Sequence, residues 1–222
     1  MEKRVFEGLE YLISYPQGFQ EDRKYPLVIF LHGAGWRKKT IDQFQQNVAV
    51  QNFLNRQDAR NYIFLVPHCK RGNWYEWMSI LIHLIENYRE ISYIDETRIH
   101  LTGNSMGGYG TWALATLRPY LFASAMPLCG GGIAGFAMNL ADLPIRAFHG
   151  LCDTIVDPLE SQQMVKAINQ YGGHAELILL PDVGHDCSKA VYSDDKNYDW
   201  LLSFAARTDK PVVEDPSFAY YG

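Results

Sequence analysis

The stretch TGNSMGGYG, residues 102–110, places one serine, Ser105, among four glycines. Glycine and serine are poor helix formers, yet residues 111–117 have the composition of a helix and residues 98–103 have that of a buried strand. Residues 103–107 fit the pattern G-x-S-x-G, which holds a serine at the tip of a tight turn between a strand and a helix. Glycines two positions before and after the serine let the strand and the helix approach closely. The stretch therefore predicts an exposed, strained serine at the start of a helix.

Short β-rich runs alternate with helical patterns along the rest of the chain. Most of the runs are apolar throughout, as in strands that are buried on both faces of a parallel sheet. This order predicts an α/β fold with an open, doubly wound and mostly parallel sheet, flanked by helices and joined by right-handed crossovers. We expect strands at 9–14, 25–31, 62–66, 98–103, 123–129, 145–149 and 175–180, and helices at 41–54, 74–88, 106–117, 158–170 and 197–206.

The length and charge of the chain limit its class. At 222 residues, without an internal repeat or a linker, the chain is expected to form a single domain over residues 1–222. Its formal net charge of −5 at pH 7 makes nucleic acids and anionic membranes poor partners. The longest apolar runs are too short to span a bilayer. We therefore expect a small-molecule partner, and the oligomeric state stays open.

The amino terminus and the cysteines bear on the cellular compartment. No basic and then apolar leader precedes Val5, and the chain opens on a strand-like segment. The four cysteines form no CxxC pair, so a structural zinc site is not expected. Free thiols are typical of cytoplasmic proteins, so we expect a cytoplasmic location.

A serine needs a base to act as a nucleophile, and the base needs an acid to orient it. Asp153 follows the predicted strand 145–149, and His185 follows the predicted strand 175–180. Because the carboxyl ends of parallel strands share one edge of the sheet, we expect Ser105, Asp153 and His185 to meet there. The chain order of serine, aspartate and histidine is that of one known fold family. These three residues are the predicted catalytic triad.

Two other residues are alternative candidates for the acid and the base. Asp157 is the alternative acid, but it is expected to cap the helix that begins at Pro158. His32 follows the predicted strand 25–31 and is the alternative base. We expect it to brace its loop through hydrogen bonds instead.

Five segments carry further motifs: FLHGAGWR (30–37), IDETRIHLTGNSMGGYGTW (94–112), PLCGGG (127–132), FHGLCDTIVDP (148–158) and VGHDCSKAVY (183–192). Together they resemble those of the α/β-hydrolases, in the branch of dienelactone hydrolases, phospholipase/carboxylesterases and prolyl-oligopeptidase-like enzymes. The chain is similar to the small esterases related to polyhydroxybutyrate depolymerase and feruloyl esterase domains. The resemblance implies the α/β-hydrolase fold with a minimal cap. One departure is Trp36, since many relatives read HGAGERG in that loop.

An oxyanion hole requires two N–H donors aimed at the developing negative charge. The backbone N–H of Met106, directly after the nucleophile, is one expected donor, and the resemblance implies Ala34 as the other. The neighbouring Gly33 and Gly35 leave that backbone unobstructed. We expect the reaction to need no metal and no cofactor.

The predicted activity is the hydrolysis of carboxylic esters through an acyl-enzyme on Ser105. Residues 130–144, where a cap would grow, have room for one short helix such as 133–140. We therefore expect an open cleft, rimmed by Trp36 and by Trp74 or Trp77, that favours short acyl or aryl esters. A prolyl-oligopeptidase-type peptidase is the alternative activity. A non-catalytic binding or scaffold protein on the same fold is the alternative of another class.

Overall fold

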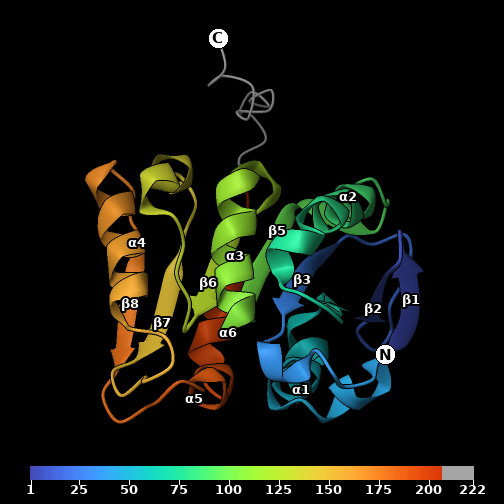
Figure 1. Cartoon of the computed structure of the whole chain (residues 1–222). Helices are drawn as coiled ribbons and strands as arrows, with labels where there is room; N and C mark the ends of the chain where they lie inside the picture. Colours follow the sequence, from blue (N-terminus) through green and yellow to red (C-terminus); the bar gives the residue numbers. More distant parts are fainter. Residues whose placement is uncertain (207–222) are drawn as a thin grey trace.

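The computed structural model describes residues 1–206 and contains an eight-stranded sheet in the order β1-β2-β4-β3-β5-β6-β7-β8. The strands β1 and β2 pair antiparallel, β2 pairs antiparallel with β4, and the strands from β4 to β8 run parallel. The predicted doubly wound, mostly parallel sheet is therefore confirmed (Figure 1). The strands are β1 (Glu2–Phe6), β2 (Leu9–Ser14), β3 (Tyr25–Leu31), β4 (Ile63–Pro67), β5 (Ile94–Asn104), β6 (Ser124–Leu128), β7 (Arg146–Gly150) and β8 (Glu176–Leu180).

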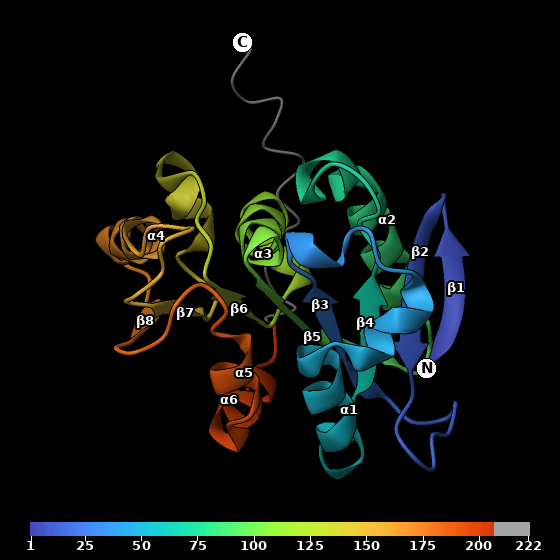
Figure 2. The same cartoon turned by 60° about the horizontal axis from the view of Figure 1, so that its bottom comes forward.

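Helices cover both faces of the sheet. Figure 2 shows α2, α3 and α4 on one side, and α1, α5 and α6 on the other. The α-helices are α1 (Val48–Arg60), α2 (Met78–Arg89), α3 (Met106–Leu117), α4 (Leu159–Gln170), α5 (Ser188–Tyr192) and α6 (Asp195–Leu202). The short 3₁₀ helices are η1 (Ala34–Trp36), η2 (Ile41–Gln46), η3 (Trp74–Trp77), η4 (Pro119–Leu121) and η5 (Ala134–Leu140).

Two apolar cores lie between the sheet and these helix layers. Successive side chains of a strand point to opposite faces, and β3 shows this alternation. Leu27, Ile29 and Leu31 enter the core with residues of α2, α3 and α4. Val28 and Phe30 enter the core with residues of α1, α5 and α6. All residues of β3 are buried, as the uninterrupted apolar run predicted.

The expected elements match most closely where the pattern is local. β2, β3 and α3 have the predicted bounds. The helix expected over 41–54 is instead η2 followed by α1, with a break at Asn47. The side chain of Asn47 accepts hydrogen bonds from the N–H groups of Ala49 and Val50, so it caps a new helix. The helix expected over 197–206 is Asp195–Leu202, capped by Asp194.

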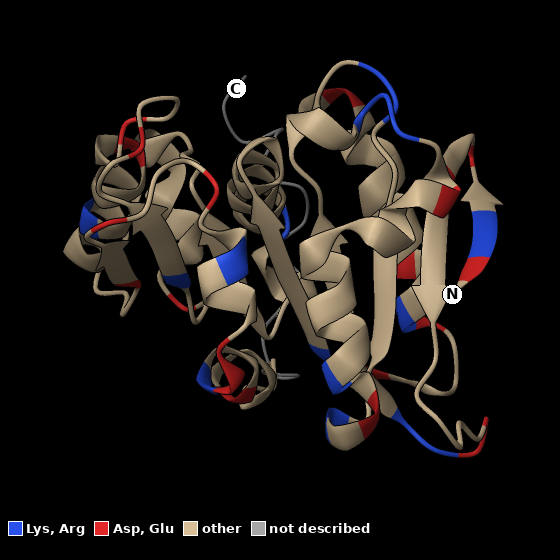
Figure 3. Ribbon diagram, turned by 90° about the horizontal axis from the view of Figure 1, so that it is seen from below, with Lys and Arg blue, Asp and Glu red and all other residues tan. Residues whose placement is uncertain are grey.

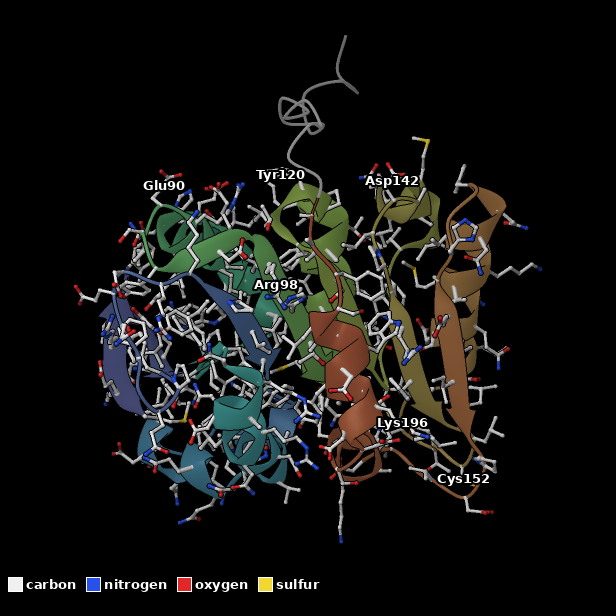
Figure 4. The ribbon with its side chains drawn as sticks, turned by 180° about the vertical axis from the view of Figure 1, so that it is seen from behind. Glu90, Arg98, Tyr120, Asp142, Cys152 and Lys196 are labelled. Atoms are coloured by element: carbon white, nitrogen blue, oxygen red, sulfur yellow. The ribbon has the colours of Figure 1, made fainter. Side chains whose placement is uncertain are left out.

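The loops that matter for function lie at the carboxyl ends of the parallel strands. Figure 4 labels Cys152, in the loop after β7, at one end of the molecule, and Tyr120 and Asp142 at the opposite end. The short helix η5 lies near Asp142, against α3 and α4, and so at the opposite end from the loop after β7. The segment that would form a cap therefore does not cover the carboxyl ends of the strands. None of the helices in residues 1–206 is long and apolar enough to cross a membrane.

Candidate active site

Ser105 lies at a sharp turn between β5 and α3. Its φ of 57° and ψ of −118° are strained for a residue with a side chain. The two flanking glycines are required because a Cβ atom at either position would clash with the backbone. A Cβ on Gly103 would lie 2.4 Å from the carbonyl oxygen of Gly107, and a Cβ on Gly107 would lie 1.8 Å from that of Leu31. The close approach of strand and helix that the motif predicted is therefore present.

Ser105, His185 and Asp153 form one hydrogen-bonded row, although 80 and 32 residues separate the bonded pairs along the chain. The Oγ of Ser105 lies 2.7 Å from Nε2 of His185, and Nδ1 of His185 lies 2.8 Å from Oδ2 of Asp153. An ionised carboxylate only accepts hydrogen bonds, so Nδ1 of His185 donates. In neutral His185 the Nε2 then accepts from the hydroxyl of Ser105. This arrangement is the one that a serine nucleophile and its base require.

The carboxylate of Asp153 is held on both oxygens. Its Oδ1 accepts the backbone N–H groups of Ile155 and Val156 at 2.8 and 2.9 Å, and Oδ2 faces His185. Burial acts to raise the pKa of Asp153, but the hydrogen bonds from Val156, His185 and Ile155 outweigh it and leave the pKa below its ordinary value. Asp153 is therefore ionised at neutral pH.

Asp157 and His32, the alternative acid and base, make other hydrogen bonds. Asp157 accepts the backbone N–H of Leu159 through Oδ1, so it caps the start of α4 as expected. His32 donates from Nδ1 to the carbonyl of Gly33 and accepts the N–H of Cys69 at Nε2. Burial lowers the pKa of His32 to about 3, so it is neutral and a poor base. It braces the loop after β3 against the loop after β4.

The loop after β3 lies against Ser105. A Cβ on Gly33 would lie 3.5 Å from Cβ of Ser105, and Ala34, the next residue, begins η1. Met106 is the first residue of α3, where the N–H groups have no helical acceptor. Both predicted oxyanion donors therefore belong to segments that border the serine. Figure 3 looks onto this end of the molecule, where lysine and arginine are most continuous in the loop after β3.

The expectation that Trp74 or Trp77 rims an open cleft is wrong. Trp74 is 1% exposed, and its indole N–H donates to the carbonyl of His32 at 3.0 Å. Trp77 is 9% exposed and donates to the carbonyl of Arg71. Both side chains pack in the core with the apolar face of α2, and the hydrogen bond from Trp74 holds the loop after β3. Trp36 is half-buried against Phe44, and its role at the rim stays a prediction.

Two tyrosines were not among the predicted site residues: Tyr109, whose N–H donates to the carbonyl of Ser105, and Tyr75, which interacts electrostatically with Tyr109. Tyr109, in the first turn of α3, is half-buried, and Tyr75 is 50% exposed. Burial and then the charge of Glu160 raise the pKa of both tyrosines, and Asp153 also contributes at Tyr109. The three aromatic residues in NWYEW, and the single tyrosine of GGYG one turn after Ser105, were the available signal.

A second histidine, His149, also contacts the acid. Its Nε2 lies 3.2 Å from Oδ2 of Asp153, and its Nδ1 lies 2.8 Å from Oγ of Ser161 in α4. Nothing in the sequence pairs residues 149 and 161. The atoms of Cys129, His149 and Asp153 that could bind a metal ion lie within 4.8 Å of one another. The ring nitrogens of His149 and the oxygens of Asp153 already have hydrogen-bond partners in the chain, so we assign them to the hydrogen-bond network.

Comparisons with known proteins agree with the fold and the motifs. The sequence is 24% identical over 155 residues to "Probable feruloyl esterase C" of Aspergillus terreus, covering 67% of this chain and 56% of that protein. It is 24% identical over 159 residues to "Feruloyl esterase C" of Emericella nidulans, covering 69% and 57%. A solved structure of a thermostable esterase superposes with a TM-score of 0.79 at 30% identity, covering 89% of this chain and 59% of that one. No protein-family profile matches the sequence.

These relatives and the parallel sheet define the class. The chain has the α/β-hydrolase fold, and its sequence is similar to those of feruloyl esterases and of a thermostable esterase. It spans less than two thirds of the length of the relatives named above.

Proposed function

We propose that the chain is a serine hydrolase that cleaves carboxylic esters through an acyl-enzyme intermediate on Ser105. The observation that carries the proposal is the hydrogen-bonded row of Ser105, His185 and Asp153 beside the start of α3. The esterase names of the relatives support the same reaction.

The first half-reaction forms the acyl-enzyme. His185 removes the proton of Ser105 through Nε2 while the serine oxygen bonds to the ester carbonyl carbon. Asp153 holds the proton on Nδ1, which keeps Nε2 free to accept, and stabilises the imidazolium that forms. The N–H groups of Met106 and Ala34 are the proposed donors to the oxyanion. The tetrahedral intermediate then expels the alcohol, which takes the proton from His185.

The second half-reaction releases the acid. A water molecule takes the place of the alcohol, and His185 removes its proton as the oxygen attacks the acyl carbon. The second tetrahedral intermediate breaks at the bond to Ser105, whose oxygen recovers the proton from His185. The free carboxylic acid leaves, and the starting state of the row returns.

We further propose that the preferred substrates are small or aryl esters. Within residues 1–206, η5 lies at the opposite end of the strands from the carboxyl-end loops and does not cover them. Tyr109 lies one helical turn after Ser105, and Tyr75, which interacts electrostatically with Tyr109, is half exposed. Both offer aromatic surface for stacking. Ile155, beside the acid, is 74% exposed and adds apolar surface. The feruloyl esterase names of the curated relatives point to the same kind of ester.

An ester panel tests this function. We expect hydrolysis of p-nitrophenyl acetate and methyl ferulate, with aminoacyl amides cleaved slowly. Faster cleavage of the amides would favour a peptidase of the prolyl-oligopeptidase type. No turnover of any member, together with no labelling of Ser105 by a fluorophosphonate, would favour a binding protein on the same fold.

Two broader proposals accompany the activity. We propose that residues 1–222 form one domain, since one sheet runs through the described residues, although residues 207–222 lie outside them. Limited proteolysis should then give one resistant core. We propose a cytoplasmic location on the basis of Cys69, Cys129, Cys152 and Cys187, all free thiols. Fractionation of the native host is the test.

A further inference from the structure

His149 is fully buried and lies at the centre of a chain of polar contacts. Its Nδ1 is 2.8 Å from Oγ of Ser161, and Ser161 donates onward to the carbonyl of Gly130 at 2.7 Å. Its Nε2 is 3.2 Å from Oδ2 of Asp153 and 3.1 Å from the carbonyl of Val156. Both atoms that face Nε2 are therefore acceptors.

This series of polar contacts contains three hydrogen bonds, and each of them needs one proton. They lie between Gly130 and Ser161, between Ser161 and Nδ1, and between Nε2 and its two acceptors. Ser161 and a neutral His149 together supply only two protons. A neutral ring protonated on Nδ1 turns the lone pair of Nε2 towards the carboxylate and a carbonyl. A neutral ring protonated on Nε2 takes the proton of Ser161 and leaves two oxygens facing each other at 2.7 Å.

His100 on β5, which β6 separates from the strand of His149, is a matched comparison. It is also fully buried, its Nδ1 lies 2.9 Å from Oγ of Ser124, and Ser124 donates to the carbonyl of Leu201. Its Nε2, however, faces no hydrogen-bond partner within residues 1–206. Two protons satisfy this arrangement, and burial lowers the pKa of His100 to about 3. The two histidines differ in the acceptors at Nε2.

We propose that His149 is a positioning residue for the acid: it carries protons on both ring nitrogens and forms a charged His149–Asp153–His185 group. This proposal rests on the serine hydrolase function proposed above for its catalytic consequence. The protonated ring satisfies all three positions, and Asp153 supplies the opposite charge that a buried imidazolium requires. His149 also ties the acid to α4 through Ser161.

The charge on His149 affects the pH range in which His185 acts as a base. The titratable groups around His149 are Asp153 in the following loop, Cys129 after β6 and, across Asp153, His185. Like charges disfavour each other, so a positive His149 makes a second imidazolium at His185 harder to form. Removing the charge on His149 therefore makes the imidazolium at His185 easier to form.

Nitrogen NMR of histidine-labelled enzyme tests the protonation state independently of activity. At about pH 7.5 we expect both ring nitrogens of His149 to show imidazolium shifts, and His100 to show one protonated and one bare nitrogen. The variants His149→Gln and His100→Gln assign the signals. A bare nitrogen on His149 at this pH would overturn the proposal, whether or not the chain hydrolyses esters.

The pH profile of kcat/KM tests the consequence. His149→Gln keeps an N–H donor towards Asp153 but removes the charge, so the midpoint of the rise with pH should move up by about one unit. His100→Gln should leave the midpoint unchanged, which separates the charge from a general loss of buried histidine. Ser161→Ala removes the hydrogen-bond acceptor at Nδ1 of His149 and should shift the midpoint in the same direction. This second variant provides the test if His149→Gln does not fold. An unmoved or lowered midpoint in both variants would contradict the positioning role, whereas failure of the hydrolase function would appear as absent wild-type turnover.

Discussion

The two aspartates of the loop after β7 allow a matched test of the acid. In Asp153→Asn the new side chain has the same shape, and only its orientation has to be decided. With the amide oxygen towards the N–H groups of Ile155 and Val156, two hydrogen bonds of 2.8 and 2.9 Å are kept. The reverse orientation would set the amide NH₂ against two N–H donors. The first orientation is therefore favoured.

This orientation places the amide NH₂ 2.8 Å from Nδ1 of His185, where the carboxylate oxygen lies in the parent. The amide donates there, so Nδ1 becomes the acceptor and the ring proton moves to Nε2. His185 then has no lone pair for the proton of Ser105. Losing the correct tautomer costs about 10⁴-fold in kcat where the same exchange applies, or about 5.4 kcal/mol of transition-state stabilisation.

Asp157→Asn is the control. Asp157 accepts the N–H of Leu159 through one oxygen, a bond that an amide oxygen also makes. We expect its kcat to stay within about threefold of the parent. The assay is kcat on p-nitrophenyl acetate for both variants, with circular dichroism to verify folding. The reasoning would be refuted if Asp153→Asn kept more than about a tenth of the rate, or if Asp157→Asn lost more than Asp153→Asn.

Three further predictions concern stability and substrate size. Gly107→Ala would place its Cβ 1.8 Å from the carbonyl oxygen of Leu31, so it should lower the free energy of unfolding in urea by about 3 kcal/mol or more. The control Gly135→Ala meets no atom within 4 Å and should change the free energy of unfolding little. Equal effects of the two variants would contradict the close packing of the turn. The lowered pKa of Asp153 means that its stabilising contribution is complete above about pH 4 and is lost as the pH falls below that value. The stability gap between the parent and Asp153→Asn should therefore narrow in acid, and a widening gap would be inconsistent with an ionised Asp153. Among p-nitrophenyl esters from acetyl to palmitoyl, kcat/KM should be highest for the short acyl groups. A maximum at decanoyl or longer would contradict the open cleft and would indicate a lipid channel.

Local features of the sequence predicted the turn around Ser105. Gly103, Gly107 and the strand and helix on either side lie within one short segment, and the contacts that forbid a Cβ there follow from that segment and β3. The edge of the sheet where Asp153 and His185 would lie followed from the parallel order of the strands. These inferences need no knowledge of distant contacts.

Other features depend on contacts that the sequence does not display. The buried positions of Trp74 and Trp77 were misjudged from their place after a strand, although their spacing with Met78 and Leu81 indicates an apolar helix face. The bond between His149 and Ser161 joins β7 to α4 and depends on how that helix packs. A short helix such as 133–140 was predicted, but the end of the sheet at which η5 lies depends on packing against α3 and α4. The catalytic roles of the row and of the oxyanion donors stay predictions.

Trapping the acyl-enzyme shows whether Ser105 is the nucleophile. The enzyme is mixed with excess p-nitrophenyl acetate, quenched in acid during the first turnover and digested for peptide mass spectrometry. We expect a burst of about one p-nitrophenol per chain and an acetyl group on the peptide that contains Ser105. Neither should occur in Ser105→Ala, whose turnover should fall about 10³-fold or more. An acetyl group on another residue, or a turnover in Ser105→Ala close to that of the parent, would contradict this role of Ser105.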